Sequence, residues 1–235
     1  GDRIFVAGDE LVVRKLQNVL EREGIPVEVF AAEAHRPNVV ARLKGSGRKR
    51  PLLIMGHTDV VNVDPKKWTH PAFSADRDGG YVYGRGTVDD KDNLTAALMV
   101  MLLLKRQNVP LDRDVIFLAE AGEEGGTRVG IEHVINQHFG AIDAEYCYAE
   151  GGGVTREKSA VRFASVQTGE KIPIGIDLIA RGPAGHGSVP LTTNAIAHLS
   201  KAVAAVTDWQ PPIDLNDTTA AYFSRLAESS STEQA

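Results

Sequence analysis

The sequence predicts an α/β fold in which a mixed, largely parallel β-sheet is flanked by helices. Short apolar runs typical of buried strands alternate with stretches whose apolar residues recur every three or four positions, as on one face of a helix. Acidic side chains or a histidine stand directly after several of these runs, and open α/β sheets carry their sites beyond the carboxyl ends of parallel strands. The chain of 235 residues, 43% of them hydrophobic, is long enough to bury a substantial core.

The first element is expected to be an amphipathic helix. Asp9 can cap its amino terminus, and Gly24 can end it, because glycine readily adopts the left-handed conformation found after helix ends. Between them, the apolar residues that share one helical face are Val12, Leu16, Val19 and Leu20.

Three strands are expected next, over residues 27–30, 38–43 and 52–55, because each range is short and rich in apolar residues. The polar turn before the third strand contains the basic triplet Arg48-Lys49-Arg50. A basic cluster of this length between two strands is typical of a solvated hairpin tip, so no functional patch is assigned to it.

The middle of the chain alternates helix and strand patterns. Asp89 precedes a stretch, residues 94–102, whose apolar positions repeat at three and four residues, so it is expected at or just before a helix amino terminus. Residues 115–119 and 146–149 have the pattern of buried strands. The acidic residues that follow these two runs are Glu123, Glu124 and Glu150.

A change of character near residue 170 predicts two domains, residues 1–170 and residues 171–235. The second is expected to be the start of a smaller α+β domain. Its predicted elements are a strand over residues 172–180, a Gly-rich turn over residues 182–188, and a helix capped by Thr193.

Composition limits the partners. A formal charge of -5 and a pI near 5.8 provide no basic surface for nucleic acid, so we expect no nucleic-acid partner. The longest apolar stretch, residues 94–104, is too short to cross a bilayer, so no membrane partner is expected either. The localisation stays open: the single Cys147 favours a reducing, cytoplasmic compartment, and the true amino terminus is expected to be absent.

His57 and Asp59 are candidates for a metal ligand and its supporting residue. Residues two apart in an extended segment point to the same side, so Asp59 can hold one ring nitrogen of His57 while the other nitrogen binds metal. A buried histidine at a strand end that is only hydrogen-bonded to a neighbouring aspartate is the alternative, and the two residues alone leave it open.

Asp89 is a candidate bridging ligand. It follows the turn Gly84-Arg85-Gly86, where glycines let the backbone pass close to a site, and a carboxylate has two oxygens that can bind two cations. The alternative is an ordinary helix cap followed by first-turn charges.

Glu123 and Glu124 are adjacent, so they are expected to have different roles: one carboxylate can bind metal while the other takes a proton from the attacking water. Glu150, beside three glycines, is a further candidate ligand. Taken alone, the two adjacent glutamates are more simply interpreted as a solvated acidic turn, and Glu150 as a turn residue. One imidazole and several carboxylates, without a thiolate, suit a divalent ion such as zinc used for hydrolysis.

Taken together, these residues resemble the di-zinc metallopeptidase family that includes aminoacylase, carnosinase, glutamate carboxypeptidase, carboxypeptidase S and succinyl-diaminopimelate desuccinylase. The resemblance covers about residues 38–190. The motifs that carry it are His57-x-Asp59, Gly84-Arg85-Gly86-x-x-Asp89-x-Lys91, Glu123-Glu124-Gly125, Glu150, and Gly185-His186-Gly187-Ser188-x-Pro190.

The resemblance implies a role for each candidate. One zinc ion would be bound by His57, Asp89 and Glu150, and a second by Asp89 and Glu124. Cobalt or manganese could replace zinc in such a site. The catalytic residues implied are Glu123 as general base and acid, Asp59 as the residue that orients His57, and His186 as an oxyanion donor.

The resemblance also implies an α/β catalytic domain interrupted by a smaller lid that mediates homodimerisation, with His186 reaching the partner's site. The implied substrate is a peptide or an N-acyl amino acid, whose amide bond is hydrolysed. Residues 1–170 would then be the amino-terminal part of the zinc-binding catalytic domain, and residues 171–235 the start of the lid.

The sequence departs from the family pattern in two places. Asp92 stands where many relatives have glycine, and the histidine that completes the second zinc site after the lid is not found beyond Pro190. The simplest interpretation is an incomplete copy that ends inside the lid, with weak binding of the second ion and little activity by itself. The alternative function is a catalytically inactive homologue or fragment that acts as a binding or dimerisation module.

Overall fold

The computed structural model describes residues 6–172 and 174–230, and its chain forms two compact units, residues 1–151 and residues 152–235. We refer to them as the first and second units and describe each by itself. The predicted division into a catalytic domain, residues 1–170, and the start of a lid, residues 171–235, stays a prediction.

The first unit contains a five-stranded sheet with the order β1-β2-β6-β3-β7. β2 pairs antiparallel with both β1 and β6, whereas β3 pairs parallel with both β6 and β7, so every strand except β2 runs in one direction. The strands are β1 (Val27–Ala31), β2 (Pro37–Leu43), β3 (Leu52–His57), β6 (Val115–Glu120) and β7 (Tyr146–Tyr148). The mixed, largely parallel sheet of the sequence prediction is confirmed.

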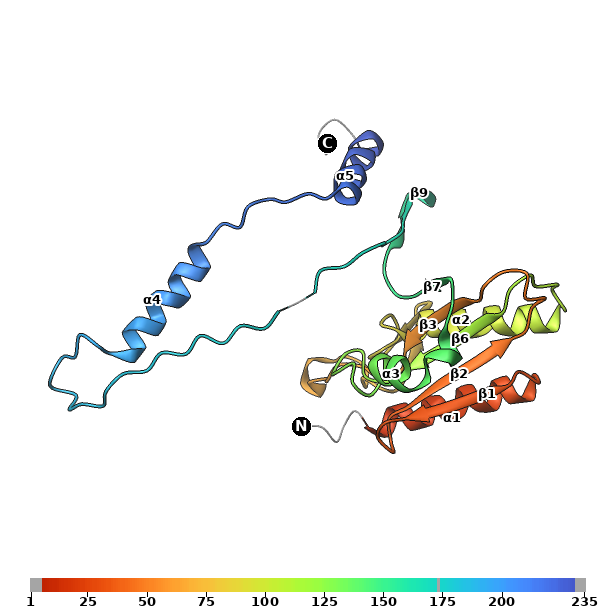
Figure 1. Ribbon diagram of the computed structural model, residues 1–235, viewed down its shortest axis with the longest axis horizontal. Helices are drawn as coiled ribbons and strands as arrows, with labels where there is room; N and C mark the ends of the chain where they lie inside the picture. The colour runs from red at the N-terminus through yellow and green to blue at the C-terminus, as the bar shows by residue number, and fades with distance from the viewer. Residues whose placement is uncertain (1–5, 173, 231–235) are drawn as a thin grey trace. The chain divides into compact units, whose positions relative to one another are not determined.

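Helices cover both faces of this sheet (Figure 1). α1 (Val6–Arg22) and α2 (Lys91–Arg106) pack on one face, and α3 (Ile131–Ile142) packs on the other. β6 lies between the layers with all six of its residues buried, as expected for a central strand covered on both sides. The apolar side chains that each helix contributes to these cores include Leu16 and Leu20 from α1, Leu94 and Met101 from α2, and Val134 and Ile142 from α3.

Two local predictions for the first unit are wrong in detail. α1 already includes Val6, so Asp9 lies within the helix and does not cap it. The basic triplet is not a hairpin tip, because β6 lies between β2 and β3 in the sheet. Lys49 and Arg50 instead form ion pairs with two acidic residues, over 2.6 Å to Asp112 and 2.9 Å to Asp143.

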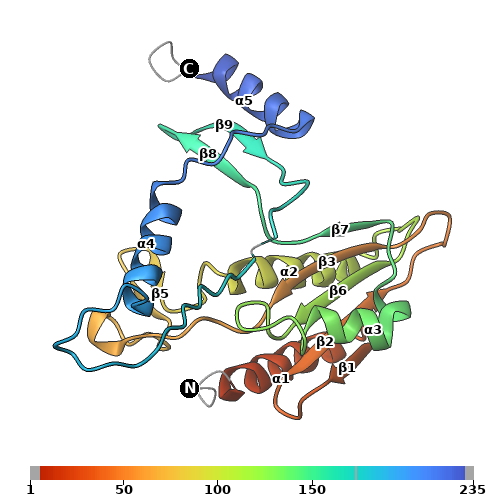
Figure 2. The same cartoon turned by 60° about the vertical axis from the view of Figure 1, so that its left-hand side comes forward.

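The connection from β3 to α2 carries only short elements, η1 (Pro65–Lys67), β4 (Asp76–Asp78) and β5 (Tyr81–Tyr83). β4 and β5 pair antiparallel in a small hairpin, visible in Figure 2. After this connection the chain returns to the end of β3, so that Asp89, just before α2, lies beside His57.

The second unit is built of local elements. β8 (Gly153–Glu157) and β9 (Ala160–Ser165) form an antiparallel hairpin, and two helices follow, α4 (Ala195–Asp208) and α5 (Asp217–Ser229). The Asn194 side chain accepts hydrogen bonds from two backbone N–H groups of α4, so the cap is Asn194 and not Thr193 as predicted.

The strand predicted over residues 172–180 does not form among the residues of this segment that the structure describes. Ile172, Ile174 and Ile176 are exposed. A strand needs a neighbour for its backbone hydrogen bonds, and no described residue of the chain pairs with this segment. The apolar pattern alone was therefore misleading.

No described helix combines the length and the apolar character that crossing a bilayer requires.

Candidate metal centre

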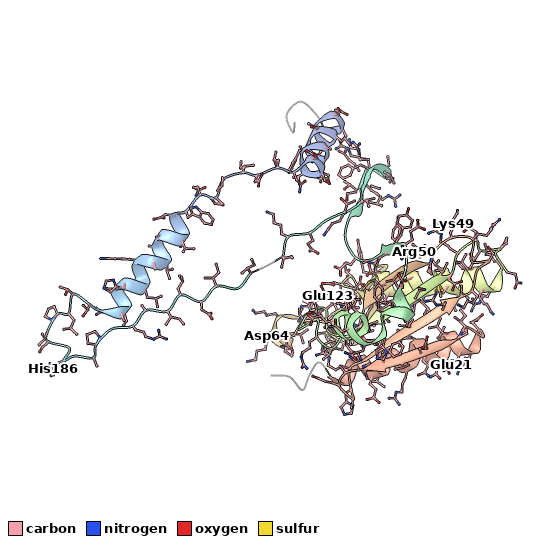
Figure 3. All side chains as sticks on the ribbon, viewed as in Figure 1. Glu21, Lys49, Arg50, Asp64, Glu123 and His186 are labelled. Carbon is pink, nitrogen blue, oxygen red and sulfur yellow. The ribbon has the colours of Figure 1, made fainter. Side chains whose placement is uncertain are left out.

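The topology brings the predicted ligands to one edge of the sheet in the first unit. β3, β6 and β7 run parallel, so their carboxyl ends meet at the same edge. His57 ends β3, Glu123 and Glu124 lie in the loop after β6, and Glu150 follows β7. Figure 3 shows Glu123 at this edge, whereas Lys49 and Arg50, which precede β3, lie toward the other end of the strands.

His57 is the centre of the cluster. Its side chain is 2% exposed, and its Nε2 atom lies 3.0 Å from Asp89 Oδ1 and 3.6 Å from Glu150 Oε2. Its Nδ1 atom lies 3.0 Å from the backbone carbonyl of Asp59 and 3.5 Å from the carboxylate Oδ1 of the same residue. One ring nitrogen thus faces Asp59 and the other faces acidic side chains, although the nearest partner on Asp59 is its carbonyl rather than the expected carboxylate.

The Asp59 carboxylate binds the backbone of Glu123 and Glu124, which we call the acid pair. Its Oδ1 accepts the N–H of Glu123 and its Oδ2 accepts the N–H of Glu124, each over 3.1 Å. Arg36 Nη2 lies 3.6 Å from Oδ2. Burial raises the pKa of Asp59, but hydrogen bonds from His57 and the backbone N–H groups outweigh it, so the pKa is lowered and the side chain is a carboxylate. This second role of Asp59 has no signal in the sequence.

Among the described residues, two overlapping groups could hold a cation. His57, Asp89 and Glu124 offer ligand atoms that lie within 4.8 Å of one another, and so do His57, Asp90 and Glu150. The first group joins residues from three separate segments of the chain. All four predicted ligands occur in these two groups, and Glu123 occurs in neither. The groups differ from the predicted sets, because Asp90 and not Asp89 joins His57 and Glu150, and His57 joins Asp89 and Glu124.

In the alternative interpretation of the Asp89 segment, Asp90 is one of the first-turn charges of the helix, whereas the structure places it at the N-cap position of α2. Its side chain is buried, and its Oδ2 accepts the backbone N–H of His57 over 3.1 Å. Gly56 permits this approach, since a Cβ atom there would lie 2.5 Å from Asp90 Oδ2. The Gly-x-Gly turn before the two aspartates is also needed, because Gly86 has a φ of 81° and a Cβ atom there would lie 2.6 Å from Val60 Cγ1.

The carboxylates of the cluster repel one another. Burial raises the pKa of Glu124, and the negative charge of Asp89 raises it further. Burial likewise raises the pKa of Glu150, with Asp90 and Asp89 adding to the effect. Like charges gathered at a partly buried edge are unfavourable without a cation, so this donor set fits a divalent ion.

The imidazole of His57 responds to the same charges. Burial lowers its pKa, but the hydrogen bonds to Asp59 and Asp89 outweigh burial and raise the pKa to about 10. We expect that in the metal-free protein the His57 ring keeps its proton at pH 7 and loses it only as the pH rises toward 10. Because the folded pKa is the higher one, the stability that the protonated ring contributes is complete below the unfolded pKa and lost as the pH rises through about 10.

An NMR titration of the ring signals in metal-free protein would measure this pKa, and His57→Gln would assign the signal. A divalent ion competes for the same nitrogen, so zinc should release the proton near neutral pH. A His57 signal that titrates near the ordinary histidine value without metal would contradict the expected ion-pair cluster.

His186 lies in the second unit, and its role as an oxyanion donor stays a prediction. Its ring is exposed, with Nδ1 accepting hydrogen bonds from the Ser188 hydroxyl over 2.8 Å and from the Ser188 backbone N–H over 3.3 Å. With Nδ1 an acceptor, a neutral ring carries its proton on Nε2. That leaves Nε2 as a hydrogen-bond donor.

Two buried polar residues near the acid pair were not singled out from the sequence. Asn38, on β2, is fully buried, and Glu120 ends β6 with 4% exposure. Burial, followed by the negative charges of Asp59 and Glu123, raises the pKa of Glu120 to about 7 despite a backbone hydrogen bond from Ile131. The only sequence signal for either was a polar residue within an apolar run.

Comparisons with known proteins identify the family of the chain. The chain is 32% identical over 171 residues to an uncharacterized carboxypeptidase of Schizosaccharomyces pombe, covering 70% of this chain and 28% of that protein. It is 30% identical over 200 residues to an N-fatty-acyl-amino acid synthase/hydrolase of Xenopus tropicalis, covering 83% of this chain and 38% of that protein. The chain thus spans only about a third of the length of these curated relatives.

Among solved structures, the chain resembles an M20 family metallo-carboxypeptidase of Sulfolobus solfataricus, with a TM-score of 0.55 and 30% identity over 63% of this chain and 33% of that one. Human carnosine dipeptidase 1 shares the fold, with a TM-score of 0.51 and 21% identity over 62% of this chain and 34% of that one. A family model described as peptidase family M20/M25/M40 matches residues 53–229. On this match, which covers more than half of its length, the chain belongs to the peptidase family M20/M25/M40.

Proposed function

We propose that the complete protein is a zinc-dependent hydrolase that cleaves the amide bond of a peptide or an N-acyl amino acid. The observation that carries the proposal is the convergence of His57, Asp89 and Glu124 from three segments, with ligand atoms within 4.8 Å of one another. Residues of these types suit zinc in hydrolytic sites. Cobalt or manganese would fit the same donor set.

Each residue has a place in the proposed reaction. When bound, the divalent ions polarise the substrate carbonyl and lower the pKa of the attacking water. Glu123 is exposed at the same edge and belongs to neither ligand group, so its carboxylate is free to take the proton of that water and return it to the departing nitrogen. Asp59 supports both metal binding and proton transfer, since it accepts hydrogen bonds from His57 and from the backbone of Glu123 and Glu124.

His186 is proposed to donate a hydrogen bond from Nε2 to the oxyanion. The bonds that Ser188 donates to Nδ1 support this, because they leave Nε2 with the ring proton. We further propose that residues 171–235 belong to a lid that forms a homodimer, through which His186 would reach the site of a second copy of the chain.

The printed names of relatives support the bond type. They include a carboxypeptidase, an N-fatty-acyl-amino acid synthase/hydrolase and an N-formyl-4-amino-5-aminomethyl-2-methylpyrimidine deformylase. The last, from Halalkalibacterium halodurans, is 34% identical over 145 residues, covering 59% of this chain and 34% of that protein. Each name refers to a bond between a carbonyl carbon and a nitrogen. The names differ in the acyl group, so the proposed substrate is kept to the class of peptides and N-acyl amino acids.

A zinc titration of the complete protein tests the proposal. We expect the wild type to bind zinc and hydrolyse N-acyl amino acids, and His57→Gln to lose more than about 100-fold in zinc affinity, since removing a ligand costs more than removing a supporting residue. His35→Gln is a matched control, because that ring is exposed and lies in neither ligand group. Equal zinc affinity in wild type and His57→Gln would contradict the proposed site.

A further inference from the structure

The loop between β6 and α3, residues 121–130, carries both members of the acid pair. Glu123 and Glu124 can divide their roles only if this loop has a fixed shape, because a displacement of about 1 Å at a catalytic group is costly. Within the loop, the Gly126 N–H donates to the Gly122 carbonyl over 3.0 Å, which closes a turn around the two glutamates. This turn needs an anchor on the sheet.

Asn38 provides the anchor at both ends of the loop. Its Oδ1 accepts the N–H of Ala121 over 2.9 Å, and its Nδ2 donates to the carbonyl of Val129 over 2.9 Å. Nδ2 also donates to the carbonyl of Phe30 over 3.1 Å, which ties the amide to β1. Since Asn38 is fully buried, water cannot replace these bonds from the bulk.

The contacts require a side-chain amide. One end of the loop presents a donor, the Ala121 N–H, and the other presents an acceptor, the Val129 carbonyl. An amide has an acceptor oxygen and two N–H donors on the same plane, which matches all three partners of Asn38. An ionised aspartate has no donor, and leucine has neither group.

We propose that Asn38 is a positioning residue of the metal centre: it fixes both ends of the 121–130 loop and thereby the places of Glu123 and Glu124. Asp59 holds the middle of the same loop through the N–H groups of these two residues. Asn38 and Asp59 thus hold the two ends and the middle of the loop, and the exposed ion pair of Arg128 with Glu33 adds a contact near its end. The inference rests on the proposed function for its effect on catalysis, but not for its effect on the loop.

The test uses the full-length protein with Asn38→Leu, which keeps the size and removes every hydrogen bond, and Asn38→Ser, which is smaller. We expect both to lower kcat by about 10- to 100-fold with KM unchanged, and to weaken zinc binding by a similar factor, as for other residues that orient ligands. Amide hydrogen exchange should quicken in residues 121–130 and stay unchanged in β3.

Val39→Ala is the matched control. Val39 is the next residue on β2 and is also fully buried, but it packs in the core on the α1 and α2 side and bonds to no part of the loop. It should lose stability while keeping kcat and zinc affinity. Folded Asn38 variants with wild-type kcat and zinc affinity would overturn the proposal. So would a Val39→Ala variant whose kcat and zinc affinity fall as far as those of the Asn38 variants.

The outcomes separate this inference from the proposed function. A wild type that neither binds zinc nor hydrolyses amides refutes the function, and amide exchange then still shows whether Asn38 fixes the loop. If neither Asn38 variant folds, exchange in the wild type decides: the Ala121 amide should exchange only with global unfolding. Exchange of this amide at the rate of an open surface loop would overturn the inference.

Discussion

Replacing Glu123 by glutamine is expected to lower kcat of the complete protein by about 10²- to 10⁴-fold, the range typical of a lost general base. Zinc content should be unchanged, because Glu123 lies in neither ligand group. Glutamine keeps the size of the side chain and the backbone N–H that Asp59 accepts. Activity should therefore fall without loss of the fold.

The neighbouring variant Glu124→Gln gives the contrast that assigns the two roles. Glu124 lies in the group with His57 and Asp89, so its variant should lose zinc as well as activity. Glu28→Gln, on an exposed position of β1, is the surface control and should change neither. Measurement of kcat, KM and bound zinc on the three variants is sufficient.

A binding or dimerisation module would behave differently. Its association with a partner would not depend on the Glu123 carboxylate, and the wild type would show no hydrolysis for the variant to lose. If Glu123→Gln lost zinc and Glu124→Gln retained it, Glu123 would be the metal ligand and Glu124 the general base.

The convergence of the site could be predicted from the sequence because it depends on local signals. His57, the acid pair and Glu150 each follow an apolar run, and parallel strands bring such positions to one edge. The place of Asp89 could be predicted because a glycine turn precedes it and a helical pattern of apolar residues comes after it. No pairing of distant residues had to be known beyond the direction of the strands.

The order of the strands could not be predicted in the same way. β2 and β3 are separated by a short polar turn, which favours a hairpin, yet β6 takes the place between them. This arrangement gains from burying β6 on both faces, an effect that depends on residues more than 70 positions apart along the chain. Local patterns contain no information on such a gain.

The buried polar residues were missed for a related reason. Asn38 and Asp90 have ordinary sequence contexts, a strand start and a helix start, and only the folded chain shows that each is buried against a backbone partner. Burial of a polar group is favourable only when its hydrogen bonds are satisfied, so the position of the partner decides. That position comes from tertiary structure.

Replacing Asp59 by asparagine should have the second large effect, on stability and metal binding together. Both carboxylate oxygens accept backbone N–H groups, from Glu123 and Glu124, and an amide can offer only one acceptor to these two donors. The change also removes the negative charge beside His57 and Arg36. Loss of one partner from a buried charged cluster costs about 3–5 kcal/mol.

Denaturant unfolding of metal-free protein would measure this cost, with Asp143→Asn as the control. Asp143 and Arg50 form an exposed ion pair of 2.9 Å, which should contribute less than about 1 kcal/mol. Zinc affinity of Asp59→Asn should fall by about 10- to 100-fold, because the loop with Glu124 and the ring of His57 both lose support.

The pH dependence of the stability difference between wild type and Asp59→Asn shows whether the charge of the Asp59 carboxylate causes it. The folded-state pKa of Asp59 is lowered, so the stability from its carboxylate is present above the unfolded-state pKa and is lost as the pH falls through the folded-state pKa. The difference in unfolding free energy between wild type and Asp59→Asn should thus be complete at neutral pH and shrink in acid. A difference no larger than that of Asp143→Asn at neutral pH would mean that the acid pair is held in place without the Asp59 carboxylate.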